Sequence, residues 1–292
     1  MPRLFKRIPG QSLRIGVSAH AVSLLRVSRW GGDKVAVLAE RAYSTEDAAA
    51  HQEHHAIGVA LRELLAGQDV AHWPVCVVLA DELARVWQVV PPQQAARLAD
   101  LEAAAALRFF GLYGEAPAAW TISADWDTRA PFFAAAIPRA LLATLEKVAE
   151  ESHLALVEVR PHFVTAWNRW RDAVKPGAWF GQLHDGMLTL AIVDGKRLHS
   201  VRALAAPEGA GRAADHAWLA QTLRREALLA GLPMPELLQL CGQVPATLTA
   251  ATAAAGAGRA APEVAVQALG APPPGEEKWS LASVLAWGGC AA

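Results

Sequence analysis

The sequence predicts an α/β protein in which one structural plan occurs twice. Leu13–Ser44 contains three apolar segments rich in β-branched residues, and a Trp-Gly-Gly-Asp turn at 30–33 separates the last two. A comparable meander returns at Trp179–Leu204, where Asp185-Gly186 and Asp194-Gly195 are strong hairpin signals. Helical sequence follows each meander. We therefore expect two α/β halves, each built on a β-meander sheet with helices.

Length and composition exclude several classes of protein. The chain has 292 residues, of which 53% are hydrophobic and 19% charged, so it is globular and long enough for two domains. A net charge of −1 argues against a dedicated nucleic-acid binder, which carries a basic excess. Cys76, Cys241 and Cys290 are far apart and lack metal-ligand spacing. We expect reduced thiols in a cytoplasmic protein.

The N-terminal segment has a basic start but no apolar core, so it is not a secretory signal, and no stretch of the chain reaches the roughly 18–20 apolar residues of a membrane span. Two interpretations of this tail stay open. Its basic and apolar side chains could dip weakly into an anionic membrane face, or the tail is disordered. The residues concerned are Arg3, Leu4, Phe5, Lys6 and Arg7.

The first half begins with strands expected over 13–17, 21–28 and 35–43. Ser44, followed by acidic residues, predicts the start of a helix that runs to Leu65 and ends at Gly67. Within this helix His51 and His55 lie four apart on one face, as two metal ligands would. No further ligand is identifiable by spacing, so a solvated helix face is the alternative and no metal site is expected.

The middle of the chain alternates strands and helices. Strands are expected over 75–79, 85–90, 119–126, 132–137 and 154–159, and helices over 93–110, 138–153 and 161–173. Pro91-Pro92 and Pro138 open two of these helices, because proline suits the first helical turn. The Ala- and Leu-rich composition of 93–110 favours a helix strongly.

After the second meander we expect a helix over about 215–231 and a strand over 237–240, which ends at Cys241-Gly242-Gln243. Residues 246–277 are low in complexity and contain a further strand near 264–266. A terminal apolar helix is expected within 279–292. An apolar helix must pack on something, and we expect it on the sheet of the second half.

This layout, opened by Leu4-Phe5-Lys6, resembles the actin-like superfamily and, within it, the PilM-type assembly proteins of bacterial type IV pili. The resemblance implies a duplicated actin-like fold with a small inserted subdomain over about 75–137. It implies a basic tail at 1–12, a first half at 13–172 and a second half at 173–292.

The resemblance also marks three loops that hold nucleotide in active relatives. Gly16 stands where the family has Asp in its first phosphate loop, and Ser18 stands where it has Gly. Gln182 and His184 replace the Asp and Gly of the second loop, and one glycine of the adenosine loop survives. The residues left at these positions are Gly16, Ser18, His20, Gln182, His184, Asp185 and Gly242.

Carboxylates in these loops hold a hydrated Mg²⁺ and position water in actin-like ATPases, and glycine and glutamine cannot do so. Asp185 lies near the second loop and could substitute. We therefore expect no catalytic residue and no resident cofactor, with ATP binding weak at best. An active actin-like ATPase or small-molecule kinase with atypical phosphate loops is the alternative.

The resemblance implies a non-catalytic scaffold of type IV pilus biogenesis or a related secretion system at the cytoplasmic face of the inner membrane. It would be similar to PilM, to MshI or to the cytoplasmic part of the type II secretion protein GspL. Its expected partners are the cytoplasmic tail of a PilN-like or GspM-like inner-membrane protein and the assembly ATPase. The expected docking place is the groove beside the inserted subdomain. Phe109 and Phe110 are candidate wall residues there, with a core role as the alternative for each.

Overall fold

The computed structural model describes residues 10–28, 34–44, 50–93, 95, 97–194, 197–206, 216–249, 263–270 and 279–288, without the side chains at 34 and 50–53. The chain divides into two compact units. Unit 1 comprises Met1–Thr165 together with Gly275–Ala292, and unit 2 is Ala166–Pro274.

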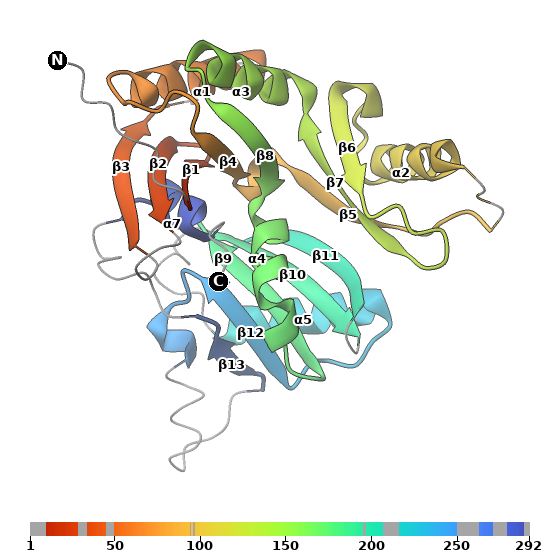
Figure 1. Ribbon diagram of the computed structural model, residues 1–292. Helices are drawn as coiled ribbons and strands as arrows, with labels where there is room; N and C mark the ends of the chain where they lie inside the picture. Colours follow the sequence, from red (N-terminus) through yellow and green to blue (C-terminus); the bar gives the residue numbers. More distant parts are fainter. Residues whose placement is uncertain are drawn as a thin grey trace. The chain divides into compact units, whose positions relative to one another are not determined.

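Unit 1 is built on a five-stranded sheet (Figure 1). Its strands are β1 (Gln11–Val17), β2 (Ala21–Ser28), β3 (Lys34–Ala42), β4 (Pro74–Leu79) and β8 (Ala155–Pro161), in the order β3-β2-β1-β4-β8. β1, β2 and β3 form the predicted antiparallel meander, and β4 and β8 run parallel to β1. The sheet therefore mixes a hairpin meander with crossover strands.

Helices cover both faces of this sheet. α1 (Ala50–Leu65) and α3 (Arg139–Glu151) pack on one face, where Leu13, Ile15 and Val17 of β1 join the main core. Side chains alternate between faces along a strand, so Gly16 faces the other side. There α7 (Leu281–Gly288) contacts β1 and β2.

The position of α7 corrects the expectation that the terminal helix packs on the second half. It belongs to unit 1 instead. Hydrogen bonds fix it to the sheet: the Oγ atoms of Ser23 and Ser283 are 2.5 Å apart, and the carboxylate of Glu40 accepts the Ser280 hydroxyl at 2.6 Å. Chain order places this helix after unit 2, but complementarity with β1 and β2 decides where it packs.

A smaller subdomain is inserted into unit 1. It consists of β5 (Arg85–Val89), α2 (Leu98–Tyr113), β6 (Trp120–Ala124) and β7 (Phe132–Pro138), with the antiparallel strand order β5-β7-β6. Short 3-10 turns, η1 (Asp81–Leu83) and η2 (Pro117–Ala119), precede β5 and β6. The insertion therefore begins later than predicted, because 75–79 lies in β4 of the first sheet.

Unit 2 repeats the five-strand plan with β9 (Ala178–His184), β10 (Met187–Asp194), β11 (Arg197–Ala205), β12 (Leu237–Gly242) and β13 (Ala265–Ala268). Their order is β11-β10-β9-β12-β13, and α5 (His216–Ala230) supplies Leu219 and Leu223 to its core. The first three strands again form a meander, and β12 and β13 again run parallel to the first. The predicted duplicated α/β architecture is confirmed.

The boundaries of the units differ from the expected ones. Unit 2 begins at Ala166, inside α4 (His162–Trp170), which is followed by the 3-10 turn η3 (Arg171–Ala173). At the N-terminus β1 begins at Gln11, so 11–12 belong to the sheet and not to a tail. Within the described part of the chain, none of the helices is both long and apolar enough to cross a membrane.

Candidate functional site

The first phosphate-loop position, between β1 and β2, is closed by its own hydrogen bonds. The Ser18 hydroxyl oxygen accepts the backbone N–H groups of Ala21 at 3.1 Å and His20 at 3.3 Å. The Ser18 N–H donates to the Ala21 carbonyl at 3.0 Å. The Ala19 N–H donates to the Glu82 carboxylate at 3.2 Å. Each N–H that could point at a phosphate already has an acceptor, and one acceptor is itself an anion.

A second set of contacts holds the same loop in place. The Tyr43 hydroxyl donates to the Ser18 carbonyl, and the Tyr43 N–H donates to the His20 carbonyl at 2.8 Å. The His20 side chain is exposed. Arg85, at the start of the inserted subdomain, donates to the Glu82 carbonyl at 3.1 Å. The loop is therefore connected through Glu82 to the base of that subdomain.

Gly16 has no room for any side chain. A Cβ at this position would lie 2.1 Å from the carbonyl oxygen of Ala282 and 2.9 Å from the backbone nitrogen of Ala286, both in α7. The expected loss of the carboxylate thus has a structural counterpart. Where the resemblance places a metal-holding Asp, this chain has a close helix-to-strand contact that only glycine permits.

The second loop position is the turn between β9 and β10. Asp185 and Gly186 have φ values of 48° and 69°, so the two-residue turn is left-handed at both positions, as the Asp-Gly signal predicts. Gln182 and His184 in β9 are almost completely buried. Burial lowers the pKa of His184 to about 4, and the nearby Asp185 carboxylate opposes this only in part. His184 is therefore a neutral buried residue at pH 7.

The third loop position, at the end of β12, is joined to the second. The N–H of Gln243 donates to the Leu183 carbonyl at 2.9 Å, and its side-chain oxygen accepts the Asp185 N–H at 3.2 Å. Gly242 has a φ of 84°, and a Cβ there would lie 2.2 Å from the Leu183 carbonyl oxygen. Gly242 is thus required by the close approach of β12 to β9.

The structure therefore brings the remnants of the second and third loops together at one end of the unit 2 sheet. The first-loop residues Gly16, Ser18 and His20 lie in unit 1. In the described ranges no group of three or more His, Cys, Asp or Glu side chains could hold a metal ion. The side chain of His51 lies outside the described residues, as do Arg3, Leu4, Phe5, Lys6 and Arg7 of the predicted tail.

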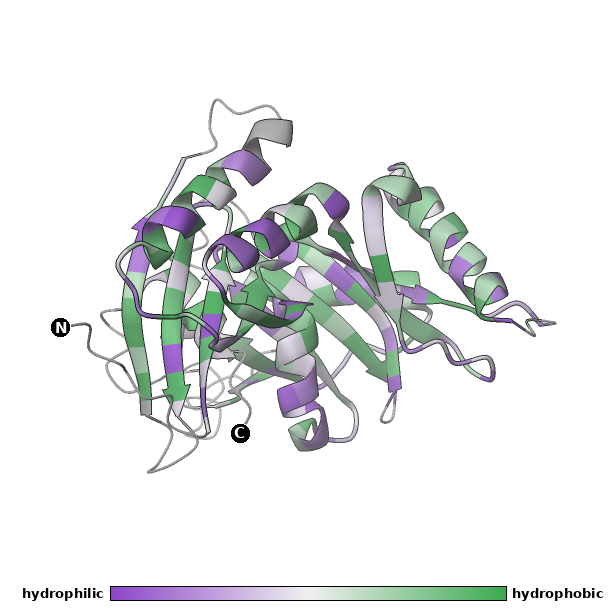
Figure 2. Ribbon diagram, turned by 45° about the horizontal axis from the view of Figure 1, so that its top comes forward, coloured by the Kyte–Doolittle hydropathy of each residue, from purple (hydrophilic) through white to green (hydrophobic). Residues whose placement is uncertain are grey.

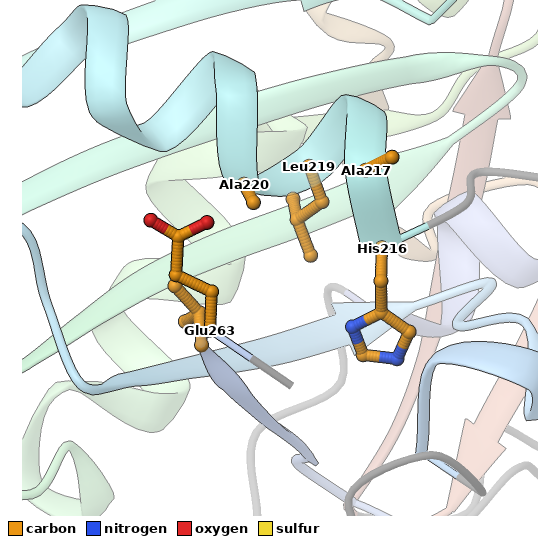
Figure 3. Close-up of a pocket in the computed structure, with 6 residues that line it drawn as sticks. His216, Ala217, Leu219, Ala220 and Glu263 are labelled. Carbon is orange, nitrogen blue, oxygen red and sulfur yellow. The ribbon is translucent and has the colours of Figure 1, made fainter. Parts of the chain in front are cut away.

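Two of the surface depressions in the described part lie away from the predicted loops. One of about 220 Å³ lies in unit 2 between the first turns of α5 and the start of β13 (Figure 3). In it a ring nitrogen of His216 lies 2.9 Å from the Leu248 carbonyl oxygen, and Glu263 pairs with Arg224. The other, of about 390 Å³, lies beside the Arg62–Glu151 ion pair of 2.7 Å. In each depression the charged residues named here take part in an ion pair.

The two candidate partner residues of the inserted subdomain have different environments. Phe109 is completely buried, with its ring 5.2 Å from that of Trp87 and 5.3 Å from that of Trp120, so it is a core residue. Phe110 is 54% exposed on α2, and Leu107, one turn earlier, is 74% exposed. The sequence interpretation missed Leu107 because an Ala- and Leu-rich helix does not show which stripe faces its sheet.

No protein-family model matches the sequence, and no curated protein does. Solved structures match in fold. A protein of unknown function with an actin-like ATPase fold from Bacteroides thetaiotaomicron has a TM-score of 0.60 at 10% identity, covering 92% of this chain and 94% of that one. A chain of the PilM-PilN type IV pilus biogenesis complex has a TM-score of 0.59 at 15% identity, covering 90% and 89%.

A third similar structure is the cytoplasmic domain of EpsL, an inner-membrane component of the type II secretion system of Vibrio cholerae. Its TM-score is 0.55 at 13% identity, and the match covers 95% of this chain and 94% of that one. These matches extend over both units and include members of the two assembly systems that the sequence resemblance names. The chain has the duplicated actin-like fold.

Proposed function

We propose that this protein is a non-catalytic cytoplasmic adaptor of type IV pilus biogenesis or of a related type II secretion system. It binds the cytoplasmic segment of an inner-membrane protein similar to PilN or GspM and meets the assembly ATPase. The likeness in fold to a chain of the PilM-PilN complex and to the EpsL cytoplasmic domain supports the setting.

The observation that carries the non-catalytic part is the closed first loop. A phosphate-binding loop presents free backbone N–H groups to the ligand. Here those of Ser18, Ala19, His20 and Ala21 are all bonded within the protein. The Glu82 carboxylate at Ala19 would also repel a phosphate, and the backbone of α7 fills the space beside Gly16. A nucleotide would have to break these contacts before gaining its own.

Isothermal titration with ATP, with and without Mg²⁺, together with a phosphate-release assay, tests this part. We expect no turnover above the buffer blank and no heat that fits a micromolar constant. A dissociation constant of about 1 μM, equivalent to about −8 kcal/mol, would contradict it. Turnover that disappears in the Asp185→Ala variant would instead support the alternative of an active ATPase or kinase with atypical loops.

The partner surface is proposed on the inserted subdomain, at the free edge of β6. The strand order β5-β7-β6 leaves β5 and β6 as edges. At β5 the Tyr113 hydroxyl donates to the Val86 carbonyl, and Arg85 lies over the Tyr113 ring. At β6 Arg85 lies over the ring of Trp120, the first residue of the strand, and Ser123 further along is exposed. An extended peptide can add there as a fourth strand, with main-chain hydrogen bonds for affinity and alternate side chains for specificity.

Binding of synthetic cytoplasmic segments of PilN-like and GspM-like proteins from the same organism tests the partner. Capture should be lost in Ala124→Pro, because the Asp125 N–H donates to Phe133 of β7 and the alternation of the strand therefore turns the Ala124 N–H to the open edge. It should be kept in Ala203→Pro on the edge strand β11 of unit 2. Circular dichroism confirms that each variant is folded. Peptides N-methylated at alternate residues give an independent readout, since only one of the two registers faces the strand. Capture abolished by Ala203→Pro alone, or no capture of any segment, refutes the site.

Peripheral contact with the inner membrane belongs to the same proposal. The basic and apolar residues of the N-terminal segment, Arg3 to Arg7, would hold the adaptor near anionic lipid. Co-sedimentation of the full chain with anionic vesicles should fall when Arg3, Lys6 and Arg7 are replaced by Ser, and should not occur with neutral vesicles. Equal binding by the unchanged and substituted chains would contradict the role of this segment.

A further inference from the structure

The inserted subdomain exposes an unusual amount of apolar surface. Of the large hydrophobic side chains that the described residues expose, half lie between Val90 and Leu112. Figure 2 shows α2 as mostly green, which marks a predominantly apolar helix. Its inner face is already used, because Leu101, Ala105 and Phe109 pack on the subdomain sheet. Of the exposed residues, Leu107 and Phe110 belong to a second face of the same helix.

This outer face forms one continuous stripe. Ala103, Leu107 and Phe110 follow one another at spacings of four and three residues, so they lie on the same side of the helix. Ala99 and Gly111 extend the stripe at its two ends and are also exposed. The stripe thus carries only small residues in the N-terminal half of α2, and its two bulky residues, Leu107 and Phe110, lie in the C-terminal half.

Such a face is self-complementary when two helices run antiparallel. Suppose that a two-fold axis crosses the antiparallel pair beside Ala105. Residues equally far before and after Ala105 then face each other, so Leu107 of one copy lies opposite Ala103 of the other, and Gly111 lies opposite Ala99. Phe110 is next to Gly111 and therefore lies beside Ala99 of the other copy. Bulky side chains then meet small ones, which allows the helix axes to approach closely. A parallel pair would set bulk against bulk.

The charges along α2 favour the same arrangement. The acidic residues Asp100 and Glu102 lie in the N-terminal half, and Arg108 lies in the C-terminal half, all exposed. In the antiparallel pair Arg108 of one copy lies opposite position 102 of the other. Asp100 of that copy is about two residues further along the helix, on the same side of the contact as Arg108. Opposite charges therefore meet at both ends of the contact, whereas a parallel pair would align like with like.

We infer that the outer face of α2 is a self-association surface that joins two copies of this chain as an isologous, two-fold dimer. The inference goes beyond the proposed adaptor role. Phe110 would contact a second copy of the chain, and the partner peptide would bind at the edge of β6. One helix pair is small for an interface, so the dimer is weak and reversible. Two copies held at one membrane face would populate it through their high local concentration.

Sedimentation of the full chain over roughly 1–200 μM, which spans the dissociation constants of small interfaces, measures the dimer directly. We expect concentration-dependent association in the unchanged protein. It should weaken by at least about tenfold in Leu107→Glu and in Phe110→Ser, because both side chains are exposed in the monomer and fill the contact in the pair.

Leu228→Glu is the matched control, because Leu228 is 78% exposed on α5 in unit 2. It should leave association unchanged. Arg108→Glu should weaken the dimer by severalfold, and the effect should shrink at high salt. All four variants should still capture the partner segment, which separates this inference from the proposed function.

Three results would overturn the inference. The unchanged chain could stay monomeric over the whole range, Leu107→Glu could associate as well as the unchanged protein, or Leu228→Glu could be the variant that abolishes association. A monomeric protein whose capture of the partner segment is lost in Leu107→Glu would assign the face to that segment, and the dimer would be rejected.

Discussion

Replacing Gly16 by alanine tests the close approach of α7 to β1. The added Cβ would lie 2.1 Å from the Ala282 carbonyl oxygen and 2.9 Å from the Ala286 nitrogen, whereas ordinary van der Waals contact begins at 3.4 Å. The obstructing atoms are backbone atoms of α7 and cannot rotate away. The helix must therefore move off β1 by more than about 1 Å to accommodate one methyl group.

The displacement has a definite cost. Overpacking a tight core costs about 1–3 kcal/mol, and the backbone clash places Gly16→Ala at the upper end of that range. Moving α7 also loosens the hydrogen bond between Ser23 and Ser283 and the packing of Leu285 against Val78. We expect the free energy of unfolding to fall by about 3 kcal/mol, with a lower denaturant midpoint and little change in the slope.

Urea unfolding at low protein concentration measures this loss, and hydrogen exchange of the amides in 279–288 locates it. Gly111→Ala is the control, because Gly111 lies in a helix and a Cβ there meets nothing within 4 Å. That variant should be more stable by about 0.5–1 kcal/mol, the helix-propensity difference. A Gly16→Ala protein within about 0.5 kcal/mol of the unchanged chain, with α7 amides equally protected, would refute the packing argument.

Three further outcomes follow from single side chains. Burial lowers the pKa of His184 from its ordinary value of 6.5 to about 4 in the folded protein. Between pH 6.5 and pH 4 the imidazole is therefore protonated in the unfolded chain but not in the folded one. For this reason the contribution of His184 to stability is complete above pH 6.5 and falls as the pH is lowered. His184→Gln should reduce the loss between pH 7 and pH 4.5 by about 2–3 kcal/mol in urea titrations at both pH values, and exposed His55→Gln should not. Asp81→Ala removes the carboxylate that accepts the N–H of Phe163, in the first turn of α4, at 2.9 Å. We expect the free energy of unfolding to fall by about 1 kcal/mol in urea titrations, and an unchanged midpoint would disprove the capping role. Arg85→Ala removes the cation–π contacts of its guanidinium with Tyr113, at 5.6 Å, and Trp120, at 5.3 Å, and should lower the thermal midpoint measurably. Arg129→Ala is the control, because that side chain is 89% exposed, and it should leave the midpoint unchanged. Equal midpoints for the two variants would contradict the role of Arg85.

The architecture was predictable from the sequence because it depends on local patterns. Alternating apolar residues specify strands, and Asp185-Gly186 specifies its hairpin because both positions take positive φ. The repeat of one meander pattern predicted the repeat of one strand order, which both five-stranded sheets show. The likeness to actin-like structures confirms this level of the prediction.

From the sequence, the resemblance also predicted atypical residues at the loop positions, at Gly16, Ser18, Gln182 and His184. It could not show why. Only the folded chain reveals that Gly16 faces the backbone of α7, or that His184 is buried, because both facts depend on contacts between residues distant in sequence. The role of Glu82 at the first loop was invisible for the same reason, as its hydrogen bond spans 63 positions.

Tertiary structure likewise decided the placement of helices whose composition is uniform. Helix α7 follows unit 2 in the chain but packs on unit 1. Gly16 of β1 allows its backbone to approach closely, and Ser23 of β2 forms a hydrogen bond with Ser283 of the helix. In α2 nearly every position is apolar, so periodicity could not assign its faces. The sheet beneath it determined that Phe109 is core and that Leu107 and Phe110 face outward, which is where the self-association surface is inferred.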